Sequence, residues 1–428
     1  MTAQSETVRR WYVLIVMLVV YMLSIADRYV ISTVLEPIKQ ELNLTDSGIA
    51  FLTGTSLALF YVFFGFPLAW LIDRGSRKVI LVASLVFWSI MTVASGLSRN
   101  YWQLLISRFG VGIGEAGGTP GANSLISDYF PAARRPMAMS VFALGAPIGA
   151  WLGSDVAGRI ADTYGWRGAF LALGVPGILV GMLLVATVKE PHRGRFDIAA
   201  REAGASFADS LRALWRNRAA FHLVIGASVT SLWGWGLMWW LPAYMIREHG
   251  MSAGSVGEML GPMHVFGGTA AIAVIGWYVA RPSMAAPQAV PKLLAAVGFL
   301  GTVVSLTMLF RTHSIAEMNW LLWLFVPSIY LSIGPSFGLL NNLAEPRMRA
   351  MFCAFVLFTT NVTNLIVAPQ AIGLLSDWIA SPHAADANSL RLALLWLAPT
   401  GFWAVFHYIR CAQILGRGQG RKPAPAFK

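Results

Sequence analysis

Charged residues are scarce in this sequence. Only 12% of its 428 residues are Asp, Glu, Lys or Arg, whereas 56% are hydrophobic, and the mean hydropathy is +0.61. Soluble chains carry about a quarter charged residues, because a water-facing surface needs a polar shell. The scarcity therefore excludes an ordinary soluble domain and predicts that most of the surface faces lipid. The 17 Trp and 24 Phe agree, because aromatic rings gather at membrane interfaces.

Cysteines and catalytic motifs are equally sparse. The two cysteines, Cys353 and Cys411, lack CxxC or Cys/His spacing, which argues against a disulfide framework or a zinc site and predicts packing roles. The sequence has no HExxH and no P-loop motif. We therefore expect a protein that is not an enzyme and binds no metal or cofactor. Its driving force is expected to be a proton or other ion gradient rather than ATP.

Long apolar stretches recur between short polar breaks. A hydrocarbon core of about 30 Å needs about 20 helical residues per crossing. Stretches of that length predict an all-α membrane protein with twelve transmembrane helices. The expected spans are 11–33, 47–72, 78–97, 101–127, 136–161, 167–188, 219–246, 255–280, 292–311, 318–342, 349–375 and 390–415.

The basic residues indicate orientation, because cytoplasmic loops retain positive charge. With a cytoplasmic N-terminus, 23 of the 32 Lys and Arg fall on the inner side, 7 on the outer side, and two, Arg28 and Arg108, within helices. Membrane topology and contact with membrane lipids thus explain the net charge of +12 better than nucleic acid does. We expect a multi-pass protein of the cell membrane with both termini in the cytoplasm and no nucleic-acid partner.

The long interior break at 189–218 falls after the sixth span. It predicts an N-terminal six-helix bundle at 1–188, a cytoplasmic linker at 189–218, a C-terminal six-helix bundle at 219–415 and a cytoplasmic tail at 416–428. Two equal bundles that rock about a site at the membrane midplane are the physical basis of alternating access. We expect a transporter that is a monomer, because each twelve-helix unit encloses its own pathway.

Ionised side chains within apolar spans are costly and therefore point to function. Arg108 and Glu115 are seven residues apart in the fourth span, share one helix face and should point into the protein. At about 1.5 Å per residue, Asp27 in the first span reaches the depth of Arg108. We expect an Asp27–Arg108 or an Asp27–Arg28 interaction that changes with the protonation of Asp27. The alternative is a permanent structural ion pair.

Polar residues in the later spans are further candidates for substrate binding. A buried histidine is more often a packing residue, and asparagines in membrane helices often make interhelical hydrogen bonds, so both have a structural alternative. The candidates are His264, Asn361 and Asn364.

The stretch AWLIDRGSRK at 69–78 lies between the second and third spans and resembles the signature GxLxDRxGR(R/K) of the major facilitator superfamily. Ala69 and Ser76 replace the usual glycines. The resemblance implies two pseudo-symmetric six-helix bundles and a cytoplasmic charge cluster that latches the outward-facing state. A positive-inside anchor would explain the basic residues but not the acid. The expected members of the latch are Asp73, Arg74, Arg77 and, from the end of the fourth span, Asp128.

Other stretches resemble the Spinster-type family within this superfamily, including LEPIK at 35–39, GIGEA at 112–116 and SDYFP at 127–131. That family is associated with the export of lysolipids and sphingoid phosphates, which implies an anionic, lipid-like substrate. An Asp-Arg pair on helix one and the acid of GxGEA on helix four are functional residues there. The resemblance carries these roles to Asp27, Arg28 and Glu115, with the two acids as proton-coupling candidates.

Two alternatives stay open at this point. The stretch EAGGTPG at 115–121 also resembles the anion:cation symporters, which import organic carboxylates with protons. In both families arginine holds an anionic group, for which Arg28 and Arg108 are the candidates. An amphiphile needs an apolar chamber, whereas a small carboxylate needs a compact polar one. The alternative of another class is a membrane sensor that transports nothing.

Overall fold

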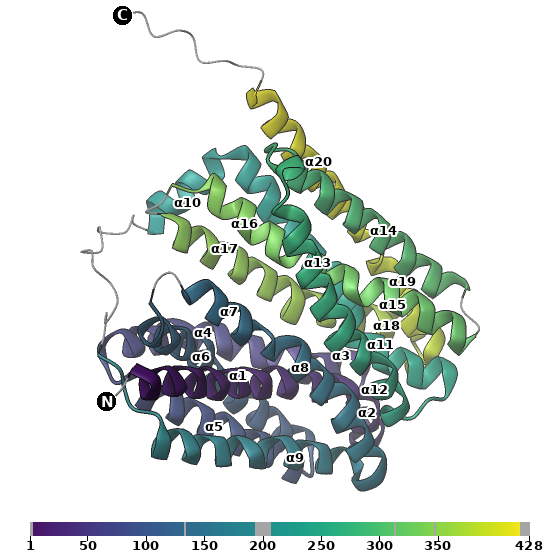
Figure 1. Ribbon diagram of the computed structural model, residues 1–428. Coiled ribbons are helices and arrows are strands. Elements are labelled where there is room, and N and C mark those ends of the chain that lie inside the picture. Colours follow the sequence, from purple (N-terminus) through teal and green to yellow (C-terminus); the bar gives the residue numbers. More distant parts are fainter. Residues whose placement is uncertain (1–2, 132–133, 193–206, 312–313, 346–347, 420–428) are drawn as a thin grey trace, which may run out of the picture. The chain divides into compact units, whose positions relative to one another are not determined.

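The computed structural model describes residues 3–131, 134–192, 207–311, 314–345 and 348–419. Every regular element in these ranges is helical (Figure 1). The chain forms two compact units. Unit 1 consists of Met1–Ala199, Trp239–Phe266 and Pro369–Leu390, and unit 2 consists of Ala200–Met238, Gly267–Ala368 and Arg391–Lys428. The predicted division of the chain at 188 and 219 stays a prediction.

Unit 1 contains the helices of the first half and some helical segments of the second half. The first-half helices are α1 (Ala3–Thr33), α2 (Leu35–Leu42), α3 (Asp46–Ala50), α4 (Ser56–Arg74), α5 (Arg77–Leu97), α6 (Tyr101–Tyr129), α7 (Arg135–Ala143), α8 (Gly145–Trp151) and α9 (Ala157–Thr187). The later ones are the end of α11 (Arg218–His249), α12 (Ala253–Pro262) and nearly all of α18 (Ala368–Ala380).

Unit 2 contains the other helices of the second half. These are α10 (Phe207–Arg216), the first part of α11, α13 (Thr269–Val279), α14 (Ala289–Arg311), α15 (Ile315–Leu331), α16 (Ile333–Leu343), α17 (Arg349–Asn361), most of α19 (Ala387–Leu397) and α20 (Thr400–Gln419). Its core packs apolar side chains from several of them, such as Leu223, Leu294, Phe352 and Tyr408.

The helices of the described ranges account for twelve membrane crossings. Ten apolar helical stretches are long enough to cross a membrane, and one of them, Arg135–Thr187, is 53 residues long. A continuous helix of that length would extend about 80 Å, more than twice the hydrocarbon thickness. Gly165, with a φ of 73°, breaks it into two crossings. The 29-residue α6, whose glycines and charges lower its hydropathy, is the twelfth, so the predicted fold class is confirmed.

A π-helical turn occurs at a corresponding place in each group of three crossings. The turns are Phe51–Thr55, Leu152–Val156, Met263–Gly268 and Val362–Val367, in the second, fifth, eighth and eleventh predicted spans. A π-turn inserts one extra residue into the helix and locally bends it. The repetition every three helices is the structural trace of an internal repeat, as expected for a transporter built from duplicated units.

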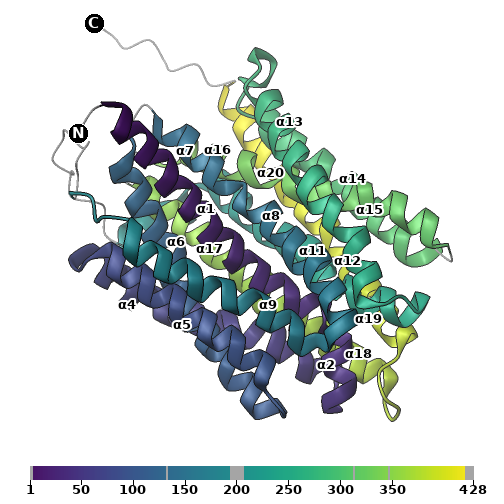
Figure 2. The same ribbon diagram turned by 60° about the horizontal axis from the view of Figure 1, so that its bottom comes forward.

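Close helix packing in unit 1 depends on the glycines of α6. In Figures 1 and 2, α1 runs alongside α8 and α9, and α6 packs against both α4 and α5. A Cβ built on Gly112 would lie 2.4 Å from the carbonyl oxygen of Leu57, and one on Gly114 would lie 2.8 Å from the amide nitrogen of Trp88. Small residues at these positions let the helix backbones approach each other. The van der Waals contacts that result attract helices to each other in lipid.

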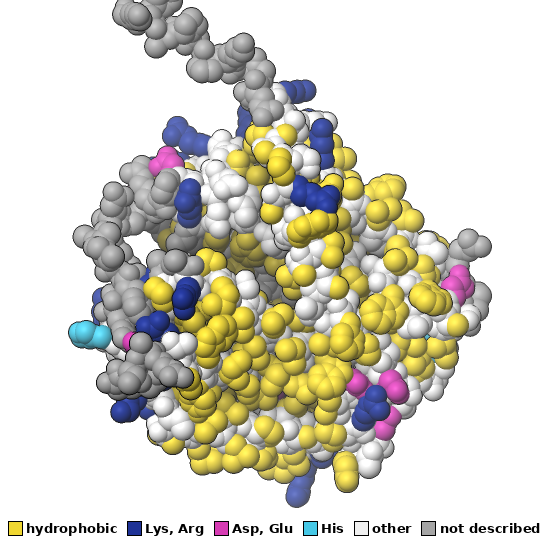
Figure 3. All heavy atoms as spheres, in the orientation of Figure 1, with side chains coloured by type: hydrophobic (Ala, Val, Ile, Leu, Met, Phe, Trp, Pro, Cys, Tyr) yellow, Lys and Arg dark blue, Asp and Glu magenta, His cyan; other side chains and the backbone are white. Residues whose placement is uncertain are grey.

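Apolar side chains also cover the outer surface. Figure 3 shows mostly hydrophobic side chains over α1, α8 and α12. Ile15, Leu179 and Met182 are about half exposed. A contiguous apolar surface would aggregate in water, so its solvent is lipid.

We expect Gly112→Ala to destabilise the protein by about 1–3 kcal/mol, because the added methyl group meets backbone atoms that cannot move away. Gly65→Ala is the matched control in α4: its Cβ has no neighbour within 4 Å, so it should be neutral or slightly stabilising. Thermal unfolding of the purified protein in detergent measures both. Equal unfolding midpoints for the two variants would contradict this account of the packing.

Candidate functional site

Two ion pairs connect α1 and α6 inside unit 1. Arg108 donates from its NH1 group to Asp27 Oδ2 at 2.9 Å. Arg28 donates from Nε to Glu115 Oε2 at 2.7 Å, and its NH2 nitrogen lies 2.7 Å from the same oxygen. Because Asp27 and Arg28 are adjacent, two neighbouring positions of α1 are tied to positions two turns apart on α6. The charge of the four ionised groups sums to zero, which makes their burial in apolar helices tolerable.

The four side chains differ in their access to solvent. Arg108 and Glu115 are 0% exposed and Asp27 is 3% exposed, whereas the Arg28 side chain is 17% exposed. Thr92 also donates to Asp27 Oδ1 at 2.6 Å, so both oxygens of that carboxylate are occupied. Asp27 and Arg108 therefore form the protected half of the cluster. Arg28 is the group that a solute can reach.

The cluster retains unused hydrogen-bonding capacity. Within the described part of the chain, Arg108 Nε, Arg108 NH2 and Glu115 Oε1 are buried without a hydrogen-bond partner. Buried polar atoms are almost always paired, so such atoms usually mark places that a water, a proton or a ligand fills. Here two donors and one acceptor belong to the same cluster as the partly exposed Arg28 side chain. The arrangement can accept a proton on the acid and an anionic group on the arginines.

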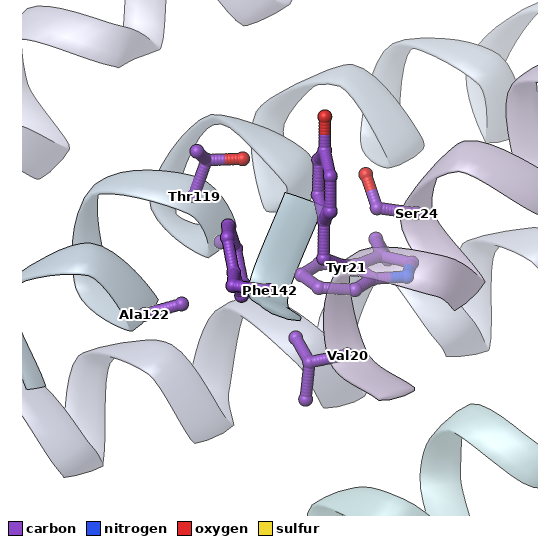
Figure 4. Close-up of a pocket in the computed structure, with 8 residues that line it drawn as sticks. Val20, Tyr21, Ser24, Thr119, Ala122 and Phe142 are labelled. Carbon is purple, nitrogen blue, oxygen red and sulfur yellow. The ribbon is translucent and has the colours of Figure 1, made fainter. Parts of the chain in front are cut away.

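The surroundings of Arg28 are aromatic and apolar. Its guanidinium lies over the Tyr61 ring, 5.0 Å from the centroid. One to two turns along α1 and α6, a crevice too narrow to admit a water molecule is lined by Val20, Tyr21, Ser24, Trp88, Gly118, Thr119, Ala122 and Phe142. Figure 4 shows Thr119 and Ser24 on either side of Tyr21 in that view. The Tyr21 and Phe142 rings stack at 4.7 Å. Little in this crevice would solvate a second charge.

The predicted contact between Asp27 and Arg108 is present. Arg28 pairs with Glu115 and not with Asp27. The Arg28–Glu115 pair was not predicted, because a comparison of Cα depths ignores how far an arginine side chain can extend along a helix. The only sequence signal for it was the count of charges: two acids and two bases in two spans pair completely only if Arg28 finds the second acid. Their roles in proton coupling and substrate binding stay predictions.

The predicted latch centres on Arg77 at the first residue of α5. Arg77 contacts the Asp128 carboxylate and donates from Nε to Glu190 Oε1 at 2.9 Å. The Asp73 side chain lies outside the described part of the structure. Arg74 is exposed and stacks on Trp70 at 4.3 Å, so its membership of the latch stays a prediction.

Glu190 is the member of the Arg77 cluster that sequence reasoning missed. It accepts hydrogen bonds from the Ser76 hydroxyl at 2.8 Å and from the Lys78 amide at 2.7 Å. Burial tends to raise the pKa of Glu190, but these hydrogen bonds and the Arg77 guanidinium outweigh it and lower the pKa below its usual value. The acid therefore stays ionised and ties the segment after α9 to the start of α5.

The remaining predicted residues lie in two different environments. His264 in unit 1 is fully buried, with its ring 4.9 Å from that of Tyr29. Asn361 and Asn364 in unit 2 line a cavity of about 220 Å³ with neutral polar neighbours such as Thr230 and Ser336. A role in substrate binding stays a prediction for all three.

The sequence around Ser336 reads GPSFG at 334–338 and matches the GxSxG spacing of serine hydrolases. In those enzymes the serine sits on a sharp turn between a strand and a helix. Here the five residues lie inside α16, so the geometry of that motif is missing.

A second ionic cluster, which the sequence analysis did not foresee, lies at the opposite end of unit 1 from the Arg77 cluster. Arg247, near the end of α11, donates to Glu36 Oε2 at 2.7 Å and to both Asp46 oxygens at 2.7 and 2.9 Å. Lys39 contacts Asp46 Oδ1 at 2.6 Å. From α18, Asp377 accepts the backbone N–H groups of Asp46 and Ser47. The Arg247 cluster thus joins α2 and α3 to the second-half helices α11 and α18.

These features define a class of protein: a twelve-helix membrane carrier with a neutralised charge cluster buried in its first half and ionic contacts at both ends of that half. The chain matches the Major Facilitator Superfamily over residues 17–368, and it belongs to that family. It is a membrane transporter and not an enzyme.

Several similar proteins support the Spinster-like assignment. The chain is 29% identical over 416 residues to an MFS-type efflux pump of Mycolicibacterium smegmatis, covering 95% of this chain and 93% of that protein. It is 28% identical to a sphingosine-1-phosphate transporter of Danio rerio, covering 85% and 75%. A crystal structure of a bacterial homologue of the human lysosomal transporter Spinster, inward-facing and unoccupied, matches with a TM-score of 0.82 and 25% identity over 97% of this chain and 99% of that one.

We expect Asp27→Asn to destabilise the protein strongly, by about 3–5 kcal/mol, because it leaves the Arg108 charge buried and unpaired. Glu115→Gln is the matched comparison and should cost less, because the partly exposed Arg28 can turn toward water. Combining Asp27→Asn with Arg108→Gln should recover part of the loss. Thermal unfolding midpoints measure the series, and a double variant less stable than Asp27→Asn alone would argue against the pair.

A pH dependence follows from Glu41, which lies between the first two membrane spans. Hydrogen bonds from Trp166 and Arg167 lower the pKa of Glu41, and they contribute stability only while the carboxylate is charged. This stability is complete above the unfolded value of about 4.3 and is lost as the pH falls through the lower folded value. Glu41→Gln should therefore lower the unfolding midpoint at neutral pH, and the difference should vanish in acid. The control is Glu317→Gln, at an exposed position, which should leave the unfolding midpoint unchanged at neutral pH.

Proposed function

We propose that this transporter moves an anionic amphiphile, such as a lysolipid or a sphingoid phosphate, across the cell membrane in exchange for or together with protons. The observation that carries the proposal is the state of Arg28. The Arg28 side chain is 17% exposed within an apolar helix, and its guanidinium is held by Glu115 and lies over the Tyr61 ring. It is a cation that an incoming anion can reach and that no other described acid satisfies.

An anionic headgroup would compete with Glu115 for Arg28. The planar guanidinium group matches the geometry of both phosphate and carboxylate oxygens, so the exchange of one for the other needs little rearrangement of Arg28. Glu115 would then be left as a buried acid without a partner, a state that is costly for a carboxylate and not for a carboxylic acid. Substrate binding and protonation of Glu115 would therefore favour each other. This coupling would let a proton gradient drive transport.

The surroundings of Arg28 favour an amphiphile over a small carboxylate. The crevice one to two turns from Arg28 is lined mostly by carbon atoms of Val20, Tyr21, Trp88 and Phe142. It is closed here, and when these side chains part they would give a lipid chain favourable contacts but offer little to a second polar group. One of the relatives, a sphingosine-1-phosphate transporter, points the same way. Another relative is an efflux pump, which supports export as the direction.

Alternating access requires contacts that break in each cycle. The Arg247 cluster seals the end of unit 1 opposite to the Arg77 cluster, and it is joined there by close packing of α12: a Cβ on Gly257 would lie 2.1 Å from the Ser154 carbonyl oxygen. We propose that the Arg247 cluster is the outer gate and the Arg77 cluster the inner latch, with both termini in the cytoplasm. One chain would contain the complete pathway and act as a monomer.

We expect Arg28→Ala to abolish proton-driven flux of sphingosine-1-phosphate or a lysolipid in proteoliposomes, because the anion loses its partner. Arg28→Lys should retain a fraction of the activity, and Glu115→Gln should bind substrate but no longer respond to a pH gradient. Arg99→Ala, the same substitution at an exposed position, should transport normally. Flux inhibited only by short carboxylates would indicate an organic-carboxylate symporter instead. Absence of flux for every candidate would indicate a sensor.

A further inference from the structure

A second cationic cavity lies in unit 1, away from the Arg28–Glu115 pair. It measures about 420 Å³ and is formed by the start of α1, the last residue of α6 and the segment that follows α9. The lining residues are Glu6, Arg9, Arg10, Tyr129, Lys189, Glu190, Pro191 and His192. The Tyr129 hydroxyl donates to the Lys189 carbonyl oxygen at 2.5 Å, which holds the segment after α9 against α6. The cavity is therefore part of the folded unit.

The charges that line this cavity do not cancel. Glu6 is paired with Arg10 at 3.2 Å, and Glu190 is held by Arg77 at 2.9 Å from outside the lining. Both acids are thus neutralised by neighbours. Arg9 and Lys189 have no ion pair within the part of the chain that the structure describes. Two cations consequently face a cavity that contains no carboxylate free to bind them.

Aromatic side chains indicate the level in the membrane at which the cavity lies. Trp11 and Tyr12 follow directly after Arg9 and Arg10 on α1 and are 41% and 37% exposed. Trp11 packs edge-on against Phe130, and Tyr12 hydrogen-bonds Thr187 at 2.6 Å, so both rings are fixed in place. Partly exposed Trp and Tyr at the end of a membrane helix lie at the level of the lipid headgroups. The cations beside them lie at the level of lipid phosphates.

We propose that this cavity binds the phosphate group of an anionic membrane lipid through Arg9 and Lys189. Clusters of basic residues at the end of a membrane helix attract anionic headgroups, and each such residue contributes substantially to binding. The volume accommodates a phosphate with its glycerol, and the acyl chains would extend along the apolar surface below Trp11. Because Glu190 lines the cavity and also binds Arg77, a bound lipid would sit beside the inner latch. The site is independent of the substrate proposed above.

The test uses the full chain in nanodiscs of phosphatidylcholine with increasing phosphatidylglycerol, with lipid retention measured by native mass spectrometry and stability by thermal unfolding. Replacing both cations by alanine (Arg9→Ala with Lys189→Ala) should weaken phosphatidylglycerol binding by about tenfold or more. The charge-preserving exchange (Arg9→Lys with Lys189→Arg) should bind as the wild type does. Arg212→Ala with Arg216→Ala removes the same charge from α10, which contributes no residue to the lining of the cavity, and should change binding less than about twofold.

The outcomes separate the sources of the phosphate. Stabilisation by phosphatidylglycerol but not by inorganic phosphate supports a lipid site. Stabilisation by inorganic phosphate that the Arg9→Ala, Lys189→Ala variant abolishes supports the phosphate site but assigns it to a soluble anion. Equal weakening in the α10 variant overturns the proposal, because it would show attraction to the surface as a whole. Unchanged binding in the Arg9→Ala, Lys189→Ala variant overturns it as well.

Discussion

The mutual neutralisation of two acids and two arginines inside apolar helices constrains the rest of unit 1. None of Asp27, Arg28, Arg108 and Glu115 is tolerable alone in lipid, so α1 and α6 must lie close enough for both pairs to form. Neutralisation also leaves one of the two pairs able to change its partner. One pair is sealed and the other has a partly exposed arginine, so an anion or a proton can alter the second pair while the first holds the helices together.

Three groups of ionic contacts in unit 1 have different surroundings. The central pairs lie between helices and only Arg28 among them is partly exposed, whereas the Arg77 and Arg247 clusters lie at the two ends, where loops and helix termini meet. Contacts at the ends can exchange protein partners for water when they open, which lowers the cost of breaking them. The sealed Asp27–Arg108 pair cannot, and the Arg28–Glu115 pair changes state when a ligand or a proton replaces a partner. This division matches what alternating access requires of gates and of a coupling site.

Membership of the superfamily defines a fold that serves many solutes, so the solute must be argued from the site. The site in this chain joins one reachable guanidinium to a mostly carbon-lined crevice, and the second-half cavity offers only neutral hydroxyl and amide groups. A solute with one anionic group and a large apolar part fits that inventory better than one with several charges.

Much of this architecture follows from the sequence. The length and hydropathy of each segment and the positive charge of its flanking loops are local properties, and they decide whether and in which direction the segment crosses the bilayer. The helical class, the twelve spans and the burial of Arg108 and Glu115 are predictable in that way. The partner of Arg28, the part of Glu190 in the latch and the Arg247 cluster depended on the tertiary structure. Each joins residues far apart in the chain, and helix tilt, side-chain reach and backbone approach at glycine decide which charges meet. Sequence spacing contains none of these distances.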